Sequence, residues 1–331
     1  MDRDSPWVPQ EGQSAATGHA ALMHALAAKH AAIAELIGGR PFHYVDVPVY
    51  GNIGDLLILH GTLAFFRRYR LAPRIAAPAL SYQSRWLKRG EVVVFQGGGN
   101  FGDLYDEYGM HPLREAVVAA YPENRIVIMP QSIHFAHEAH RERSARLFRQ
   151  HPDVHIFVRD KSSYHAARAF SDHVYLMPDM AHQLYPIAAK SDMMTGGALM
   201  ISRMDDEKNR ASGKSGFNVM ATTDWPIVIG DKECRIDLFR RGLRGMNRLG
   251  LGWLGNKMLF TRWIAFSGEL IEDAVRLFSA HDRIVTDRLH GHILACLMNK
   301  PSIVLDNNYG KNSRYVDAWT VGSGLVSLMT V

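Results

Sequence analysis

Short hydrophobic runs alternate with longer amphipathic segments along most of the chain. Five of these runs are rich in Val, Ile and Phe and have the length of a strand: 42–49, 91–95, 125–129, 154–158 and 173–177. The segments between them, such as 56–70, have the composition of helices. Strands that alternate with helices are typical of βαβ units, so the pattern predicts a parallel sheet.

The alternation fades at 185–197, which we interpret as a linker, and then begins again. Further strands are expected at 198–202, 226–230, 283–287 and 302–306. The predicted fold class is therefore α/β, with two Rossmann-like doubly wound halves and a central cleft between them.

Three segments follow from this division. The N-terminal half takes residues 41–190 and the C-terminal half takes 191–331. Residues 1–40 precede them as a disordered N-terminus, covering the first 18 residues, and a helix at 19–38 that Gly38 and Gly39 end.

Composition and charge narrow the class of protein. The 331 residues suit two domains, and 47% hydrophobic with 21% charged residues suits a globular chain with packed cores. A net charge of +5 is compatible with an anionic substrate, an anionic membrane or nucleic acid, and it chooses none of them.

Location is predicted from what the sequence lacks. Its two cysteines are far apart, with neither a disulfide framework nor metal-type spacing, so we expect a cytoplasmic protein. The polar N-terminus has no basic region followed by an apolar core, and no stretch reaches about 18 uncharged apolar residues.

Two glycine-rich segments follow predicted strands. In GNIGD (51–55), Asp55 either caps a helix or takes part in a site, and both interpretations stay open. QGGGNFGD (96–103) contains a literal G-x-G-x-x-G. We reject a dinucleotide site because Gly109 and Pro112 leave no room for a long helix there, and we expect a loop where a bulky ligand approaches the backbone.

No metal site is predicted. His134, His137 and His140 form a loose stripe that is more typical of a solvated helix face, and His290 and His292 diverge on a helix because they are two residues apart.

A basic amphipathic segment spans residues 237–263. It either lies on an anionic membrane or packs on its own domain with its arginines in water.

Two arginines occupy matched positions at strand ends. Arg159 follows the strand at 154–158, and Arg288 follows the strand at 283–287. A guanidinium at a helix start suits a phosphate or a carboxylate, and His290 beside Arg288 adds a proton donor. The pattern indicates an enzyme that handles a small, doubly anionic substrate.

These segments, in this order, resemble the polysaccharide pyruvyltransferases. The resemblance covers about residues 42–320 and rests on GNIGD, GGGNFGD, PQS, VRDKSS and DRLHGHILACLMNKPSIVLDNNYGK. It implies two Rossmann-like halves similar to GT-B glycosyltransferases. It also implies phosphoenolpyruvate as donor, a sugar of a surface polysaccharide as acceptor, a pyruvate ketal as product and no further cofactor.

The resemblance also implies roles for residues. Arg159, Arg288, Leu289 and His290 would bind the donor, with His290 and Arg288 catalytic. A base for the sugar hydroxyl would have to come from the other half, and our own candidate for it is Asp55. Asp287 stands where many relatives carry a small or apolar residue. The acceptor side would comprise Asn52, Asp55, Gly98, Gly99, Asn100, Asp103, Gln131 and Ser132.

The alternatives come from two other classes. A GT-B glycosyltransferase that uses a nucleotide sugar shares the expected fold and an anionic donor. A module that binds an anionic membrane or nucleic acid through 237–263 is the other, although no aromatic platform for bases accompanies the arginines. For the transferase, the expected partners are phosphoenolpyruvate, a free or lipid-linked oligosaccharide and the inner face of the plasma membrane, without nucleic acid.

Overall fold

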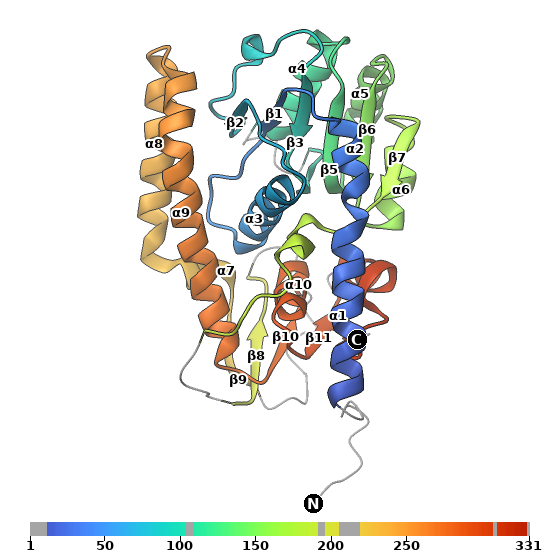
Figure 1. Cartoon of the computed structure of the whole chain (residues 1–331), viewed down its shortest axis with the longest axis vertical. Coiled ribbons are helices and arrows are strands. Elements are labelled where there is room, and N and C mark those ends of the chain that lie inside the picture. Colours follow the sequence, from blue (N-terminus) through green and yellow to red (C-terminus); the bar gives the residue numbers. More distant parts are fainter. Residues whose placement is uncertain (1–11, 104–108, 191–195, 205–218, 307–309, 330–331) are drawn as a thin grey trace, which may run out of the picture. The chain divides into compact units, whose positions relative to one another are not determined.

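A computed structural model describes residues 1–331 except 1–11, 104–108, 191–195, 205–218, 307–309 and 330–331. Its internal contacts divide the chain into two units (Figure 1). The larger unit comprises Lys29–Leu184 and Trp225–Asp273, and the smaller unit comprises Met1–Ala28, Tyr185–Asp224 and Ala274–Val331.

The larger unit is built on a parallel sheet with the order β2-β1-β3-β5-β6-β7, and β4 pairs with β5. The strands are β1 (Phe42–Val45), β2 (Ile75–Ala77), β3 (Val92–Phe95), β4 (Gly98–Phe101), β5 (Ile126–Ile133), β6 (Val154–Val158) and β7 (His173–Leu176). Every residue of β1, β3 and β6 is buried, as is typical of parallel strands. The five predicted strands of this half are confirmed, and β2 and β4 are additional.

Helices and short 3₁₀ turns connect these strands. They are α2 (Ala31–Ile37), α3 (Ile53–Arg68), α4 (Met110–Ala120), α5 (Glu138–Arg149), α6 (Lys161–Ala167), η1 (Ser84–Trp86) and η3 (Met180–Leu184). Side chains of the sheet and helices form one core, with Phe95, Phe101, Phe148 and Phe170 among its fully buried members.

A helical segment from the second half of the sequence belongs to the larger unit. It contains α7 (Trp225–Ile229), η5 (Gly230–Lys232), α8 (Glu233–Arg248) and most of α9 (Gly252–Ser279). Trp263 Nε1 donates to the carbonyl oxygen of Pro48 at 2.8 Å, and Ser81 Oγ donates to Asn256 Oδ1 at 2.8 Å. The division therefore differs from the predicted one, which placed 225–273 in the C-terminal half.

The strand predicted at 226–230 is wrong, because α7 occupies this segment. Pro226 lies in the first turn of α7, where backbone N–H groups have no acceptor within the helix, so the absence of an N–H on proline costs no hydrogen bond. The apolar Val and Ile in this run favoured a strand in the sequence pattern, and tertiary packing of Trp225 and Ile229 outweighs that preference.

The smaller unit contains a second parallel sheet, with the order β12-β11-β10-β8-β9. Its strands are β8 (Ala198–Ile201), β9 (Val219–Thr223), β10 (Arg283–Thr286), β11 (Ser302–Leu305) and β12 (Val326–Met329). Its helical elements are α1 (Gly12–Lys29), α10 (Leu289–Leu297), α11 (Lys311–Tyr315) and the π-helical turn η6 (Val316–Thr320). The strands predicted at 198–202, 283–287 and 302–306 are confirmed. Two parallel α/β sheets are thus present, as the predicted fold class requires.

The predicted helix at 19–38 is confirmed as α1 and α2, with a break at His30. The expectation of disorder is wrong for residues 12–18, which lie in α1, and residues 1–11 lie outside the described residues. By length and composition alone, 18–37 passes as a membrane span although it carries Lys29 and Glu35. Its apolar side chains Met23 and Ile33 are nevertheless fully buried in the protein.

The packing of α3 against η3 depends on a glycine. A Cβ atom at Gly61 would lie 2.2 Å from the carbonyl oxygen of Met180. Gly61→Ala should therefore lower the free energy of unfolding by about 1–3 kcal/mol, measured by urea denaturation. The control is Gly245→Ala, since a Cβ at this helical position meets nothing within 4 Å and should leave stability unchanged or slightly increased. Equal stability of the two variants would contradict this account.

Candidate functional site

The strand order of each sheet points to the place where a ligand binds. In the larger unit the order reverses between β1 and β3, and in the smaller unit it reverses between β8 and β10. Crossovers on the two sides of such a point leave in opposite directions and open a crevice at the carboxyl ends of the strands. Asp46 and Gln96 follow β1 and β3, while Ser202 and Asp287 follow β8 and β10.

Asp46 begins a buried polar network in the larger unit. Asp46 is 3% exposed, and its backbone has a φ of 68°, a left-handed conformation that Asp tolerates better than most residues. Arg114 Nη2 donates to Asp46 Oδ2 at 2.5 Å, and Asn100 Nδ2 donates to the same oxygen at 3.2 Å. Gln131 Nε2 extends the network by donating to Asn100 Oδ1 at 3.0 Å and to Gln96 O at 2.7 Å.

Burial and neighbouring charges set the proton affinity of Asp46. Burial raises its pKa, the guanidinium of Arg114 and the amide of Asn100 oppose that increase, and the negative charge of Asp55 adds to it. The result is a pKa raised to about 6. A carboxylate with this pKa is ionised at neutral pH and can still accept a proton, which suits a general base.

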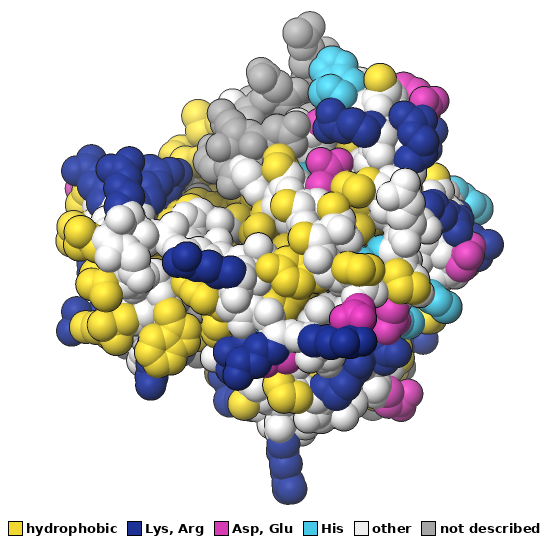
Figure 2. Space-filling view, turned by 90° about the horizontal axis from the view of Figure 1, so that it is seen from above, with side chains coloured by type: hydrophobic (Ala, Val, Ile, Leu, Met, Phe, Trp, Pro, Cys, Tyr) yellow, Lys and Arg dark blue, Asp and Glu magenta, His cyan; other side chains and the backbone are white. Residues whose placement is uncertain are grey.

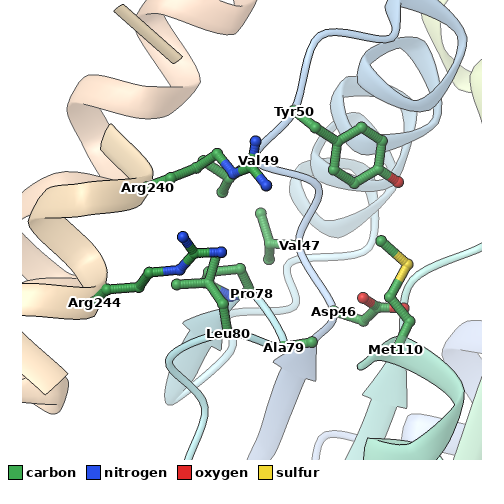
Figure 3. Close-up of a pocket in the computed structure, with 10 residues that line it drawn as sticks. All are labelled: Asp46, Val47, Val49, Tyr50, Pro78, Ala79, Leu80, Met110, Arg240 and Arg244. Atoms are coloured by element: carbon green, nitrogen blue, oxygen red, sulfur yellow. The ribbon is translucent and has the colours of Figure 1, made fainter. Parts of the chain in front are cut away.

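A cavity of about 210 Å³ lies beside Asp46 in the larger unit (Figure 3). Asp46, Tyr50 and Met110 lie on one side of it, and Arg240 and Arg244 extend toward it from α8. Loop residues complete the lining: Val47, Val49, Pro78, Ala79 and Leu80. Both hydrogen bonds of Asp46 use Oδ2, so the carboxylate presents Oδ1 to the cavity.

The two glycine-rich motifs meet in the larger unit. Asp55 lies in the first turn of α3, and its Oδ1 is 3.3 Å from the place where a Cβ of Gly98 would stand. Gly98 has a φ of 134°, which a residue with a side chain rarely adopts. Asp55 also contributes to the raised pKa of Asp46, so the two carboxylates act on one region.

The remainder of the second glycine motif differs from the predicted ligand loop. Residues Gly98–Phe101 form β4, in which Gly99 is half-buried. A Cβ at Gly97 would lie 2.8 Å from Pro130 O, and one at Gly102 would lie 1.6 Å from His134 O. These two glycines therefore serve close packing of the protein's own backbone.

Several residues predicted to bind the acceptor have structural partners within the protein, and their part in acceptor binding stays a prediction. Asn52 caps α3 by accepting from the Gly54 amide at 2.9 Å. Asp103 accepts from the amides of Ala136 and His137, and these bonds lower its pKa although burial opposes them. Asn100 and Gln131 belong to the Asp46 network, in which Gln131 donates through Nε2 while its buried Oε1 has no hydrogen-bond partner among the described residues.

The histidines of 134–140 lie around the start of α5. His140 Nδ1 is 3.2 Å from Asp103 Oδ2, and His137 is the residue before α5. Among the described residues, no group of three or more His, Cys, Asp or Glu side chains has the geometry to hold a metal ion.

Arg159 follows β6 as predicted, and it is 1% exposed. Its Nη1 donates to Asp179 Oδ2 at 2.6 Å, and its Nη2 donates to Ser132 Oγ at 3.0 Å. Ser132 is thus a partner of Arg159, and the buried ion pair holds the guanidinium in place at the carboxyl edge of the sheet.

In the smaller unit, Arg288 is the residue before α10 and its side chain is 11% exposed. Its Nε and Nη2 both donate to the carboxylate of Asp224, which follows β9. This two-point contact fixes the plane of the guanidinium. Asp224 Oδ2 also accepts from the Met204 amide at 3.1 Å.

The neighbours of Arg288 differ in exposure. Leu289 is buried, so its side chain turns inward, whereas His290 in the first turn of α10 is half-buried. Asp287 accepts from the Arg203 amide and the Ser202 hydroxyl, and burial raises its pKa. His292 is fully buried, with one ring nitrogen 2.9 Å from Ser302 Oγ and the other 2.9 Å from Thr320 Oγ1.

Four residues of these sites were missed from the sequence: Asp46, Gln96, Arg114 and Asp224. Asp46 lay inside the strand predicted at 42–49, although an acid within an apolar run was an available signal. Asp224 lay before the misassigned strand at 226–230, and nothing in the local sequence marks Arg114 as buried.

Comparisons with known proteins agree on one family. The model of the polysaccharide pyruvyl transferase family matches residues 52–309. The chain is 38% identical to EpsO of Bacillus subtilis, whose provisional name is pyruvyl transferase, over 84% of this chain and 85% of that one. It is 30% identical to pyruvyl transferase 1 of Schizosaccharomyces pombe, over 72% of this chain and 57% of that one.

A solved structure shares the fold. A functionally uncharacterised protein of Klebsiella pneumoniae aligns with a TM-score of 0.53 and 19% identity, over 92% of this chain and 98% of that chain.

The Asp46–Arg114 pair generates a stability prediction. Asp46→Asn should lower the free energy of unfolding by about 3 kcal/mol or more, because it leaves a fully buried guanidinium without its counter-charge. The control is Asp172→Asn, which removes an exposed partner of Arg149 and should leave the urea midpoint unchanged. Similar midpoints for both variants would show that the buried pair does not hold this region together.

Proposed function

The chain belongs to the polysaccharide pyruvyl transferase family, and we propose that it moves the enolpyruvyl group of phosphoenolpyruvate to two hydroxyls of a sugar. The product would be a pyruvate ketal on a surface or exopolysaccharide precursor. The observation that carries the proposal is the placement of Arg288 and His290 at the start of α10, beside the strand-order reversal of the smaller unit.

The donor site is assigned to this helix start. Arg288 and the first amides of α10 together suit an anion, and Asp224 holds the guanidinium plane in a fixed orientation. Arg159 of the larger unit, held by Asp179 and Ser132, is proposed to bind the second anionic group of phosphoenolpyruvate. No further cofactor is required by this assignment.

The proposed chemistry needs one acid and one base. His290 delivers a proton to the methylene carbon of phosphoenolpyruvate while a sugar oxygen attacks the adjacent carbon and a base removes the hydroxyl proton. Inorganic phosphate then leaves with its bonding electrons, and the second hydroxyl closes the ketal ring and loses its own proton. Acid catalysis by a positioned histidine accelerates such a step by about 10²–10⁴-fold.

Asp46 replaces Asp55 as the proposed base for the first hydroxyl. Asp46 lines the cavity with one carboxylate oxygen toward the open space, and its pKa is raised to about 6. Asp55 keeps a supporting role, since its negative charge helps to raise the pKa of Asp46. Tyr50, beside the cavity, offers a ring and a hydroxyl to the acceptor sugar.

A cytoplasmic location is also part of the proposal. Both cysteines are free thiols, with Cys234 exposed and Cys296 buried, which suits a reducing compartment.

His290 can be tested apart from donor binding. His290→Gln should lower phosphate release by about 10²-fold or more, because glutamine forms hydrogen bonds but cannot transfer a proton at this pH. Affinity for phosphoenolpyruvate, measured by calorimetry, should stay within a few fold. His165→Gln, an exposed substitution on α6, is the control and should keep full turnover. Substantial ketal formation by His290→Gln would assign the acid to another group.

The pH profile separates the two candidate bases. Turnover should fall as pH drops through about 6, because protonated Asp46 cannot accept the hydroxyl proton. In Asp55→Asn this acid limb should move to lower pH, since removal of the Asp55 charge lowers the pKa of Asp46. Loss of turnover at every pH in Asp55→Asn would instead make Asp55 the base, as the sequence first indicated.

A further inference from the structure

Helices α8 and α9 form an antiparallel hairpin (Figure 1). Near its base, the ring of Phe239 stacks on Phe266 with centroids 5.8 Å apart. Near its turn, a Cβ at Gly255 would lie 2.7 Å from Met246 Cβ, so the helices approach closely there. The hairpin is therefore an ordered element, and its turn has a defined outer surface.

The outer surface of the turn is apolar. We call residues 249–258 the hairpin tip. Its large hydrophobic side chains are exposed to unusual extents: Leu249 74%, Leu251 45%, Trp253 50%, Leu254 39% and Met258 55%. Leu251, Leu254 and Met258 recur at helical spacing and share one face. A monomeric protein rarely leaves such a cluster in water without a partner.

The charge around the tip has one sign. Residues 238–263 contain six Lys or Arg and no Asp or Glu. Arg241, Arg244, Arg248, Lys257 and Arg262 are all exposed. Figure 2 shows hydrophobic side chains beside a group of Lys and Arg over this end of the hairpin. The surface is thus complementary to an anionic partner that also offers an apolar layer.

An anionic bilayer fits both properties, because its headgroups are negative and its acyl region is apolar. Lys257 lies 5.5 Å from the ring centroid of Trp253, a pairing that suits the interface between water and lipid. A nucleic acid would use the cations but leave the aliphatic side chains exposed. A protein partner would cover the leucines, but a protein interface usually pairs charges of both signs, and residues 238–263 carry no Asp or Glu.

The same helix connects the tip with the cavity. Arg240 and Arg244 of α8 line the cavity that contains Asp46, and Arg244 is about 7.5 Å along the helix axis from Leu249. A sugar joined to a lipid by a short anionic linkage would therefore reach Asp46 while its linkage passes the two arginines.

We propose that the hairpin tip inserts into the headgroup region of an anionic membrane and that the cavity receives the sugar of a lipid-linked acceptor there. The membrane contact is inferred only from the exposed apolar and basic side chains of the tip. The assignment of the acceptor rests on the proposed function.

Vesicle flotation tests the membrane contact without any turnover. The protein should float with phosphatidylcholine vesicles that contain phosphatidylglycerol, bind pure phosphatidylcholine vesicles weakly, and lose binding as salt rises. Leu249→Ser/Leu251→Ser should weaken binding about tenfold or more, because these side chains enter the apolar layer. The matched control is Ile227→Ser/Leu238→Ser, which removes exposed apolar side chains, 57% and 70% exposed, outside the tip.

Three outcomes would overturn the proposal. They are absence of flotation at low salt, equal loss in the tip and control variants, and a change of oligomeric state in the tip variant by analytical ultracentrifugation, which would make the tip a protein interface. Phosphate release with a water-soluble acceptor should be the same for the tip variant and the unmodified chain. If neither the tip variant nor the unmodified chain released phosphate, this result would count against the proposed function and would leave the membrane contact unaffected.

Discussion

Reversal of strand order is the constraint on which both sites depend. Each sheet places its first strand beside its third, so the neighbouring crossovers leave in opposite directions from the carboxyl ends of these strands. In the larger unit this brings Asp46 and Gln96 together, and in the smaller unit it brings Asp287 and Arg288 beside Ser202. The sheets therefore bring residues that lie far apart in the sequence together at the carboxyl ends of these strands.

Buried ion pairs then fix the orientation of charged side chains at these strand ends. Arg114 forms an ion pair with Asp46, Asp224 with Arg288, and Asp179 with Arg159. Such pairs contribute little net stability, because the loss of hydration offsets their attraction. Their effect is on orientation, since each fixes a charged group at a strand end before any ligand binds.

Sequence reasoning recovered the fold better than the site. Strands such as 125–129 and 283–287 were predictable because buried parallel strands are continuous Val and Ile runs. The strand predicted at 226–230 was wrong because an apolar run of this length is equally suited to a helix. The neighbouring strand β9 was missed because its residues alternate between exposed and partly buried positions and do not form an apolar run. The positions of Arg159, Arg288 and His290 after strands were predictable from the sequence, and their roles stay predictions. Asp46 and Arg114 were not predictable, because their importance arises from a contact between residues 68 positions apart. Asn52 and Asp103 accept backbone amides in the structure, and the sequence alone could not separate such a structural role from binding because both use the same chemistry.

The central claim is that this chain makes a pyruvate ketal from phosphoenolpyruvate. The most direct measurement follows the unmodified protein with phosphoenolpyruvate and a panel of oligosaccharide acceptors, recording inorganic phosphate and the methyl resonance of the sugar product by NMR. The account predicts phosphate release that depends on the acceptor and equals the amount of ketal formed. Release without an acceptor product, or sugar transfer from a nucleotide sugar in place of ketal formation, would contradict it.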